Sequence, residues 1–218
     1  STTTSRSSIR EWHEQARRGK LVAPTVTLCC YPEDNGFVEA YSALIRQTLE
    51  DLPPNIKYRL LFSAHGLPES VIKSGDPYQA QVEQTAAAIA SGLGIEGLDW
   101  RISYQSRVGP MKWIGPSTEH EIEAAGKEGK ALVVIPVAFV SEHSETLVEL
   151  DIEYAELAKE SGVPHYHRVP AVGTHPAFID GLAGLVRKAI DGNGTMAGSG
   201  KRVCPAKCGQ CALQEKAA

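Results

Sequence analysis

Short apolar runs rich in β-branched residues alternate with amphipathic helical stretches along most of the chain, and this rhythm constrains the fold more than any other feature. The expected strands are residues 21–30, 58–62, 100–104, 131–140 and 166–169. The expected helices are residues 9–18, 37–52, 76–93, 117–126, 145–159 and 176–190. Because strands separated by crossover helices build parallel sheets that are covered on both faces, the sequence predicts an α/β fold in which helices flank a parallel sheet.

The composition is ordinary for a globular domain. The 218 residues, 42% of them hydrophobic, can bury one domain or one domain plus part of another. A net charge of −4 argues against nucleic acid as a partner, since proteins that bind it concentrate basic residues on one face. No apolar run is as long as a bilayer span and no signal peptide is visible, so a cytoplasmic location is expected. Peripheral contact with the inner membrane surface and the oligomeric state stay open.

Polar residues follow three of the expected strands at the point where each strand ends. His65 comes after the second strand, residues 105–110 follow the third, and residues 141–145, which include His143 and Glu145, follow the fourth. Because ligands bind beyond the carboxyl ends of the strands in open parallel sheets, we expect His65, His143 and Glu145 to be neighbours. Taken alone, His65 also fits an ordinary loop histidine, and Glu145 an ordinary carboxylate at the start of a helix.

Three glutamates follow one another at helical spacing in the expected helix 145–159. Glu145, Glu149 and Glu153 recur every four residues, so an α-helix would carry all three along one side. On a surface this stripe is a solvated face, whereas in a cleft it attracts divalent cations or receives protons. The spacing does not decide between these alternatives.

The cysteines gather at the end of the chain. Cys204, Cys208 and Cys211 form a C-x3-C-x2-C motif after the glycine-rich residues 191–200, which we expect to be a flexible linker. An odd number of cysteines without a secretory signal favours a metal or cluster site over disulfides, and both zinc and iron–sulfur fit. Radical-SAM enzymes use the same spacing, but only residues 212–218 follow the motif here, so that alternative is rejected.

Four sequence blocks resemble those of ferrochelatases, and the resemblance extends over residues 1–190. The blocks are FSAHGLPES at 62–70, GDPY at 75–78, YQSRVGPMKWIGP at 104–116 and IPVAFVSEHSETLVELDIEY at 135–154. The resemblance implies two Rossmann-like domains with a porphyrin in the cleft between them. It implies insertion of Fe²⁺ into protoporphyrin IX to give protohaem.

The same resemblance implies roles for individual residues. His65 and Glu145 would be the catalytic pair that handles the iron and the pyrrole protons, with the division of labour between them left open. Glu149 and Glu153 would form a route for iron or protons. The residues implied at the substrate are Trp113, Phe139, His143 and Glu149. The two aromatic residues in this set have an ordinary alternative as core packing.

Some ferrochelatases carry a [2Fe–2S] cluster on three C-terminal cysteines and one distant cysteine, and Cys204, Cys208 and Cys211 fit that pattern. Where animal ferrochelatases have the distant cysteine, this sequence has Thr2, so Cys29 or Cys30 would have to supply the fourth ligand. These two residues also fit small apolar side chains at a strand end.

The resemblance also implies a domain organisation. Residues 1–52 would be the remnant of a largely missing N-terminal domain, 53–190 the C-terminal domain, 191–203 a linker and 204–218 a cysteine tail. The first methionine is Met111, and the missing segment would form the opposite wall of the cleft. Two alternatives are another class II tetrapyrrole chelatase and a non-catalytic fragment that binds an iron–sulfur cluster.

Overall fold

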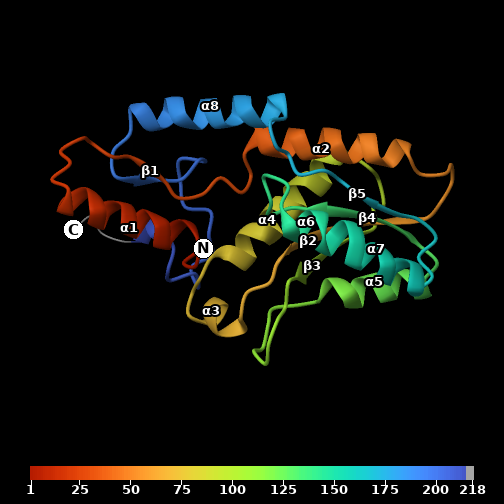
Figure 1. Cartoon of the computed structure of the whole chain (residues 1–218). Helices are drawn as coiled ribbons and strands as arrows, with labels where there is room; N and C mark the ends of the chain where they lie inside the picture. Colours follow the sequence, from red (N-terminus) through yellow and green to blue (C-terminus); the bar gives the residue numbers. More distant parts are fainter. Residues whose placement is uncertain (215–218) are drawn as a thin grey trace.

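A four-stranded parallel sheet forms the centre of the molecule. The computed structural model describes residues 1–214, so the last four residues of the predicted cysteine tail lie outside the described part. The strand order is β3-β2-β4-β5 (Figure 1). The strands are β2 (Tyr58–His65), β3 (Trp100–Gln105), β4 (Ala131–Pro136) and β5 (Tyr166–Arg168). The predicted α/β fold with a parallel sheet is therefore confirmed.

Helices connect the strands and cover both faces of the sheet. The connections along the chain are α3 (Glu69–Lys73) with α4 (Tyr78–Leu93), α5 (Thr118–Lys127), and α6 (Ser144–Leu147) with the π-helix η1 (Glu149–Glu153) and α7 (Tyr154–Glu160). Two more helices flank the domain, α2 (Asn35–Glu50) before the sheet and α8 (Pro176–Ile190) after it. No helix within residues 1–214 is both long and apolar enough to cross a bilayer.

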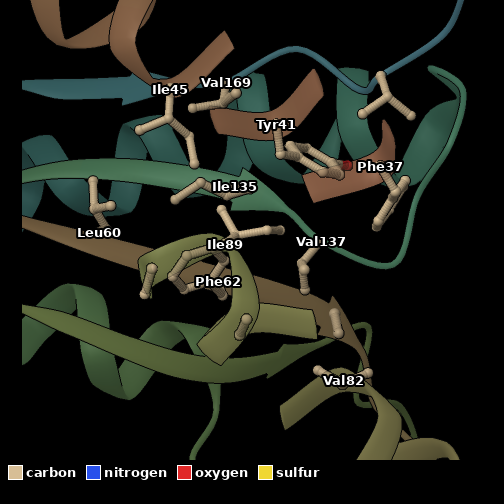
Figure 2. Close-up of a cluster of buried hydrophobic side chains, with 14 of the residues drawn as sticks. Phe37, Tyr41, Ile45, Leu60, Phe62, Val82, Ile89, Ile135, Val137 and Val169 are labelled. Atoms are coloured by element: carbon tan, nitrogen blue, oxygen red, sulfur yellow. The ribbon is translucent and has the colours of Figure 1, made fainter. Parts of the chain in front are cut away.

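The alternation of side chains along the strands divides the core into two layers. In β2, Leu60 and Phe62 face α2 and α4, where they meet Tyr41 and Ile89 (Figure 2). Leu61 points to the other face, into the layer that α5 and α7 close. Since β2 and β4 are buried on both faces, the sheet is rigid at the place where its strands end.

A second, two-stranded sheet corrects two of the predictions. Only Thr27–Leu28 of the expected strand 21–30 pairs as a strand, and its partner segment is equally short. Pro24, which has no amide hydrogen to donate, lies before the paired residues. This strand, β1, pairs in parallel with β6 (Thr195–Met196). The flexible linker predicted at 191–200 is thus wrong over its middle, because hydrogen bonds to β1 fix its backbone.

The N-terminal segment lies beside this small sheet. Helix α1 (Ser5–Arg18) begins four residues earlier than expected and has no buried side chain. Figure 1 shows α1 and β1 together at one end of the molecule, away from the four-stranded sheet. The described part of the chain ends in a short 3₁₀ helix, η2 (Ala212–Gln214).

Candidate functional site at the carboxyl edge of the sheet

His65 and Glu145 meet at the carboxyl edge of the sheet. His65 is the last residue of β2 and Glu145 lies in the first turn of α6, directly after the loop that follows β4. The distance from His65 Nε2 to Glu145 Oε1 is 3.5 Å, and the two side chains are 38% and 37% exposed. The proximity expected from parallel strand ends is confirmed, and the pair is open to a ligand.

Hydrogen bonds determine which nitrogen of His65 faces the glutamate. Its Nδ1 lies 2.6 Å from the carbonyl oxygen of Gly66. Because a carbonyl can only accept, Nδ1 is the donor to Gly66, and Nε2 is the nitrogen that faces Glu145. An imidazole nitrogen and a carboxylate oxygen at this distance can hold a proton or a metal cation between them.

Glu149, predicted at the substrate, is held by protein donors. Its carboxylate accepts from the Ser106 amide (2.7 Å) and hydroxyl (2.5 Å), the Gln105 side-chain amide (2.8 Å) and the Tyr154 hydroxyl (3.0 Å). The same Gln105 amide donates to the carbonyl oxygen of Glu145 at 2.9 Å. Glu149 therefore fastens the segment that carries Glu145 to the end of β3.

The continuous α-helix predicted for 145–159 is wrong. A π-helical turn, η1, separates α6 from α7, and Val148 O accepts from the amides of both Ile152 and Glu153. The wider turn changes the angle between successive glutamates, so the straight stripe expected from four-residue spacing does not form. Glu153 lies exposed at the end of this turn.

The predicted aromatic residues and His143 lie around the pair. The ring of Phe139 is buried and packs against His143, with ring centres 5.0 Å apart. His143 Nδ1 accepts from the Glu145 amide at 3.2 Å and so caps α6. The half-buried Trp113 lies against Gly66, the residue after His65. A Cβ added to Gly66 would lie 3.3 Å from the Trp113 ring.

Asp76, just before α4, and Tyr78, the first residue of α4, support the site, and the sequence predicted no role there for either. The Tyr78 hydroxyl donates to the carbonyl oxygen of His65 at 2.9 Å. Burial, followed by the charge of Glu145, raises the pKa of Tyr78, so this hydroxyl stays protonated as a donor. Burial alone would raise the pKa of Asp76, but donors from Thr2 and the Tyr78 amide outweigh it and lower the pKa. The GDPY block was the available signal for both residues.

Comparison with known proteins decides the family. The sequence model described as "Ferrochelatase" matches residues 1–190. The chain belongs to the ferrochelatase family. The ferrochelatase of Phenylobacterium zucineum is 55% identical over 214 residues, which are 98% of this chain and 61% of that protein. The ferrochelatase of Rickettsia typhi is 44% identical over 97% of this chain and 60% of its own length.

The match to ferrochelatases does not extend over their whole length. The chain spans 61%, 58% and 54% of the curated relatives from Phenylobacterium zucineum, Caulobacter vibrioides and Pelagibacter ubique. Among solved structures, SirB from Bacillus subtilis with Fe³⁺ aligns with a TM-score of 0.49 and 14% identity. That alignment covers 72% of this chain and 55% of SirB, a likeness too distant to bear on function.

In this member of the ferrochelatase family the cysteine tail is packed against α4. Cys204, Cys208 and Cys211 are all buried, and burial raises the pKa of Cys204 to about 12. Cys204 interacts with Cys211 and with Cys30, which lies just after β1. Within residues 1–214, no group of three or more His, Cys, Asp or Glu side chains has the geometry to hold a metal ion. The thiols are thus gathered in one place without closing around an ion.

The pairing of β1 with β6 brings the distant cysteines to the tail. The amide of Cys29 donates to Met196 O at 2.9 Å, and the carbonyl of Cys30 accepts from Gly198 N at 2.8 Å. Thr2 has a different partner, because its amide and hydroxyl both donate to Asp76 at 2.6 Å. Cys29 and Cys30 are therefore the residues outside the tail whose thiols could add a fourth ligand, whereas Thr2 has no thiol and bonds to Asp76.

Proposed function

We propose that the chain inserts Fe²⁺ into protoporphyrin IX to form protohaem. The observation that carries the proposal is the His65–Glu145 pair, in which the imidazole Nε2 faces a carboxylate oxygen at 3.5 Å on an open edge. Membership of the ferrochelatase family supports the same reaction. Since the relatives are longer, the activity is proposed for this chain as part of the complete enzyme.

The geometry suggests how the pair would act. Insertion breaks two pyrrole N–H bonds and forms bonds from the porphyrin nitrogens to iron, so two protons must leave. In its neutral form, His65 would accept one proton at Nε2 as the first N–H bond breaks, and the carboxylate of Glu145 would accept the proton of the second; water at this open edge would then take both protons away. The hydrogen bond from Nδ1 to Gly66 O keeps the ring in the orientation that this step requires. Glu145 can also bind the entering cation, and the division of labour stays open between the two residues.

Apolar side chains would provide the surface for the macrocycle. We place Trp113 and Phe139 at the porphyrin, with His143 beside Glu145 and Glu149 holding the segment in place. The loop that carries Trp113 also exposes Val108 and Met111, and the end of α6 exposes Leu147 and Val148. Burial of a flat apolar ligand against such a surface is the main source of its affinity.

The test is an insertion assay with protoporphyrin and Fe²⁺, or Zn²⁺ as a spectroscopic substitute. We expect loss of porphyrin fluorescence with Fe²⁺ at a rate that depends on protein concentration. Faster insertion of Co²⁺ into a different tetrapyrrole would indicate another class II chelatase instead. An iron–sulfur absorption spectrum without any porphyrin binding would support a non-catalytic fragment.

We further propose that the tail holds a [2Fe–2S] cluster on Cys204, Cys208, Cys211 and Cys30. Three buried thiols and the electrostatic influence of Cys30 on Cys204 support this set, and thiolates suit a cluster. The cluster would accept electron density from these four sulfurs and would link the tail to β1. Zinc is the competing occupant, since four thiolates also suit zinc.

Substitution of the adjacent cysteines separates the two candidates for the fourth ligand. We expect Cys30→Ser to abolish the visible absorption and the electron paramagnetic signal of the reduced cluster. Cys29→Ser, the matched control on the same segment, should retain both. The reverse result would assign the ligand to Cys29, and stoichiometric zinc without iron would remove the cluster proposal.

We also propose a division into domains, a location in the cell and a contact with the membrane. Of residues 1–52, α1 and β1 would belong to a first chelatase domain, whereas Tyr41 and Ile45 of α2 pack in the core of the four-stranded sheet and place this helix with residues 53–190, the second domain. The greater length of the relatives supports this division. We place the protein in the cytoplasm, with peripheral contact to the inner membrane surface as a route for its apolar substrate. Flotation with vesicles would test that contact.

A further inference from the structure

The cysteine tail rests directly on residues 74–76, here called the docking loop, between α3 and α4. The Gln210 amide donates to Gly75 O at 3.1 Å, and its side-chain amide donates to the carbonyl and hydroxyl oxygens of Ser74 at 2.9 and 3.1 Å. The two backbones touch, because a Cβ on Gly75 would lie 2.9 Å from Gly209 N. Gly75 also has a φ of +100°, which few other residues adopt. The loop therefore cannot move toward the tail without displacing it.

The other side of the docking loop leads to His65. Asp76 is 2% exposed and accepts from the Tyr78 amide at 2.7 Å, which fixes the start of α4 relative to the loop. Tyr78 in turn donates its hydroxyl to the His65 carbonyl at 2.9 Å. A displacement of the loop would thus carry Tyr78 with it and release the backbone of His65.

We propose that Gln210 is a positioning residue for His65, acting through the docking loop and Tyr78. This positioning role rests on the proposed function only in the test that measures the turnover of metal insertion. Packed interfaces move between discrete arrangements and do not deform continuously, so loss of the Gln210 contacts changes the position of the loop as a unit. The side chain of Gln210 never approaches the substrate, and its influence is on the geometry of the His65–Glu145 pair.

Other contacts of the tail provide a matched control. The Gln84 side-chain amide donates to Val203 O at 2.9 Å, so it also fastens the tail to α4. Gln84 lies about two turns farther along α4 and, within residues 1–214, has no hydrogen bond to the docking loop, Tyr78 or His65. A purely structural role of the tail would make Gln84 and Gln210 equivalent, whereas positioning of His65 makes them different.

The test in turnover uses Gln210→Glu in the complete enzyme. The new carboxylate is repelled by the Ser74 carbonyl and turns toward Arg6, which already donates to Gln210. We expect kcat for Zn²⁺ insertion into protoporphyrin to fall about five-fold or more, with the KM for porphyrin and the cluster absorption unchanged. Gln84→Met should keep the parental kcat. If Gln210→Glu does not fold, Gln210→Met is used in its place, because it removes the same side-chain donors without adding a charge.

A double-mutant cycle tests the route. If Gln210 acts through Tyr78, then Gln210→Glu in a Tyr78→Phe background lowers kcat no further. The proposal would be overturned if the double variant lowers kcat by the product of the two single fold-decreases. A parental kcat in Gln210→Glu would overturn it as well.

A spectroscopic measurement on this chain separates the inference from the proposed function. The ring C2–H resonance of His65, identified by its loss in His65→Gln, should shift in Gln210→Glu and stay in place in Gln84→Met. The resonance of the exposed His120 on α5 should not move in either variant. An unmoved His65 resonance in Gln210→Glu refutes the positioning role. A shifted resonance in a protein that inserts no metal refutes the function and leaves the positioning role intact.

Discussion

Replacement of His65 by alanine is expected to lower the rate of metal insertion by about 100-fold or more, the usual effect of losing a positioned proton acceptor. The imidazole that faces Glu145 disappears, and the neighbouring His143 uses its Nδ1 to cap α6. Insertion of Fe²⁺ or Zn²⁺ into protoporphyrin in the full-length enzyme measures the loss. Glu145→Ala should produce a loss of similar size.

The control for this prediction is His120→Ala. His120 is exposed on α5 and lies outside the site, so its replacement should leave the rate unchanged. Retained activity in His65→Ala would contradict the proposed role of the pair. Binding of porphyrin, followed by its fluorescence, should survive in all three variants, since the apolar surface is untouched.

Replacement of Glu149 by alanine is expected to lower the free energy of unfolding by about 2–4 kcal/mol. The carboxylate accepts four hydrogen bonds, and its removal leaves the amide and hydroxyl of Ser106 without their acceptor, at about 1–3 kcal/mol for each group that water does not reach. The Gln105 amide keeps Glu145 O and the Tyr154 hydroxyl keeps Glu119, so these two donors add less. Urea denaturation followed by circular dichroism measures the change.

Glu153→Ala is the matched control for Glu149→Ala. It removes the next carboxylate of the series, which is exposed and should change stability by no more than about 0.5 kcal/mol. Equal effects of the two substitutions would show that Glu149 does not fasten the segment to β3. A stable Glu149→Ala variant that has lost only iron affinity would instead favour the direct role predicted from the family resemblance.

The sheet and the central pair were predictable because both depend on local pattern and a general rule. Alternating apolar runs indicated the parallel strands, and parallel strands end at one edge, which brought His65 and Glu145 together. The position of Glu149 was not predictable in the same way. A π-helical turn has no clear sequence signal, and the donors from Gln105 and Ser106 belong to a different strand end.

Long-range contacts account for the remaining differences. The glycine-rich segment before the tail looks flexible in isolation, but β6 finds its partner in β1, far earlier in the chain. Asp76 was recognisable as the start of a helix, whereas its bonds to Thr2 depend on the folded chain. Tyr78 lies within the GDPY block, but the hydrogen bond from its hydroxyl to the His65 carbonyl depends on the folded chain.

The pairing of β1 with β6 has a consequence for the order of events during maturation. Cys30 follows β1 and the other three cysteines follow β6, so the four thiols come together only after this pairing forms. Closing such a long loop costs entropy that the contacts of the central sheet must first offset. Before this pairing, the nascent chain has only the three thiols of the tail close together. On the proposed ligand set, the fourth thiol would join them only after folding, so a cluster would have to enter a folded protein.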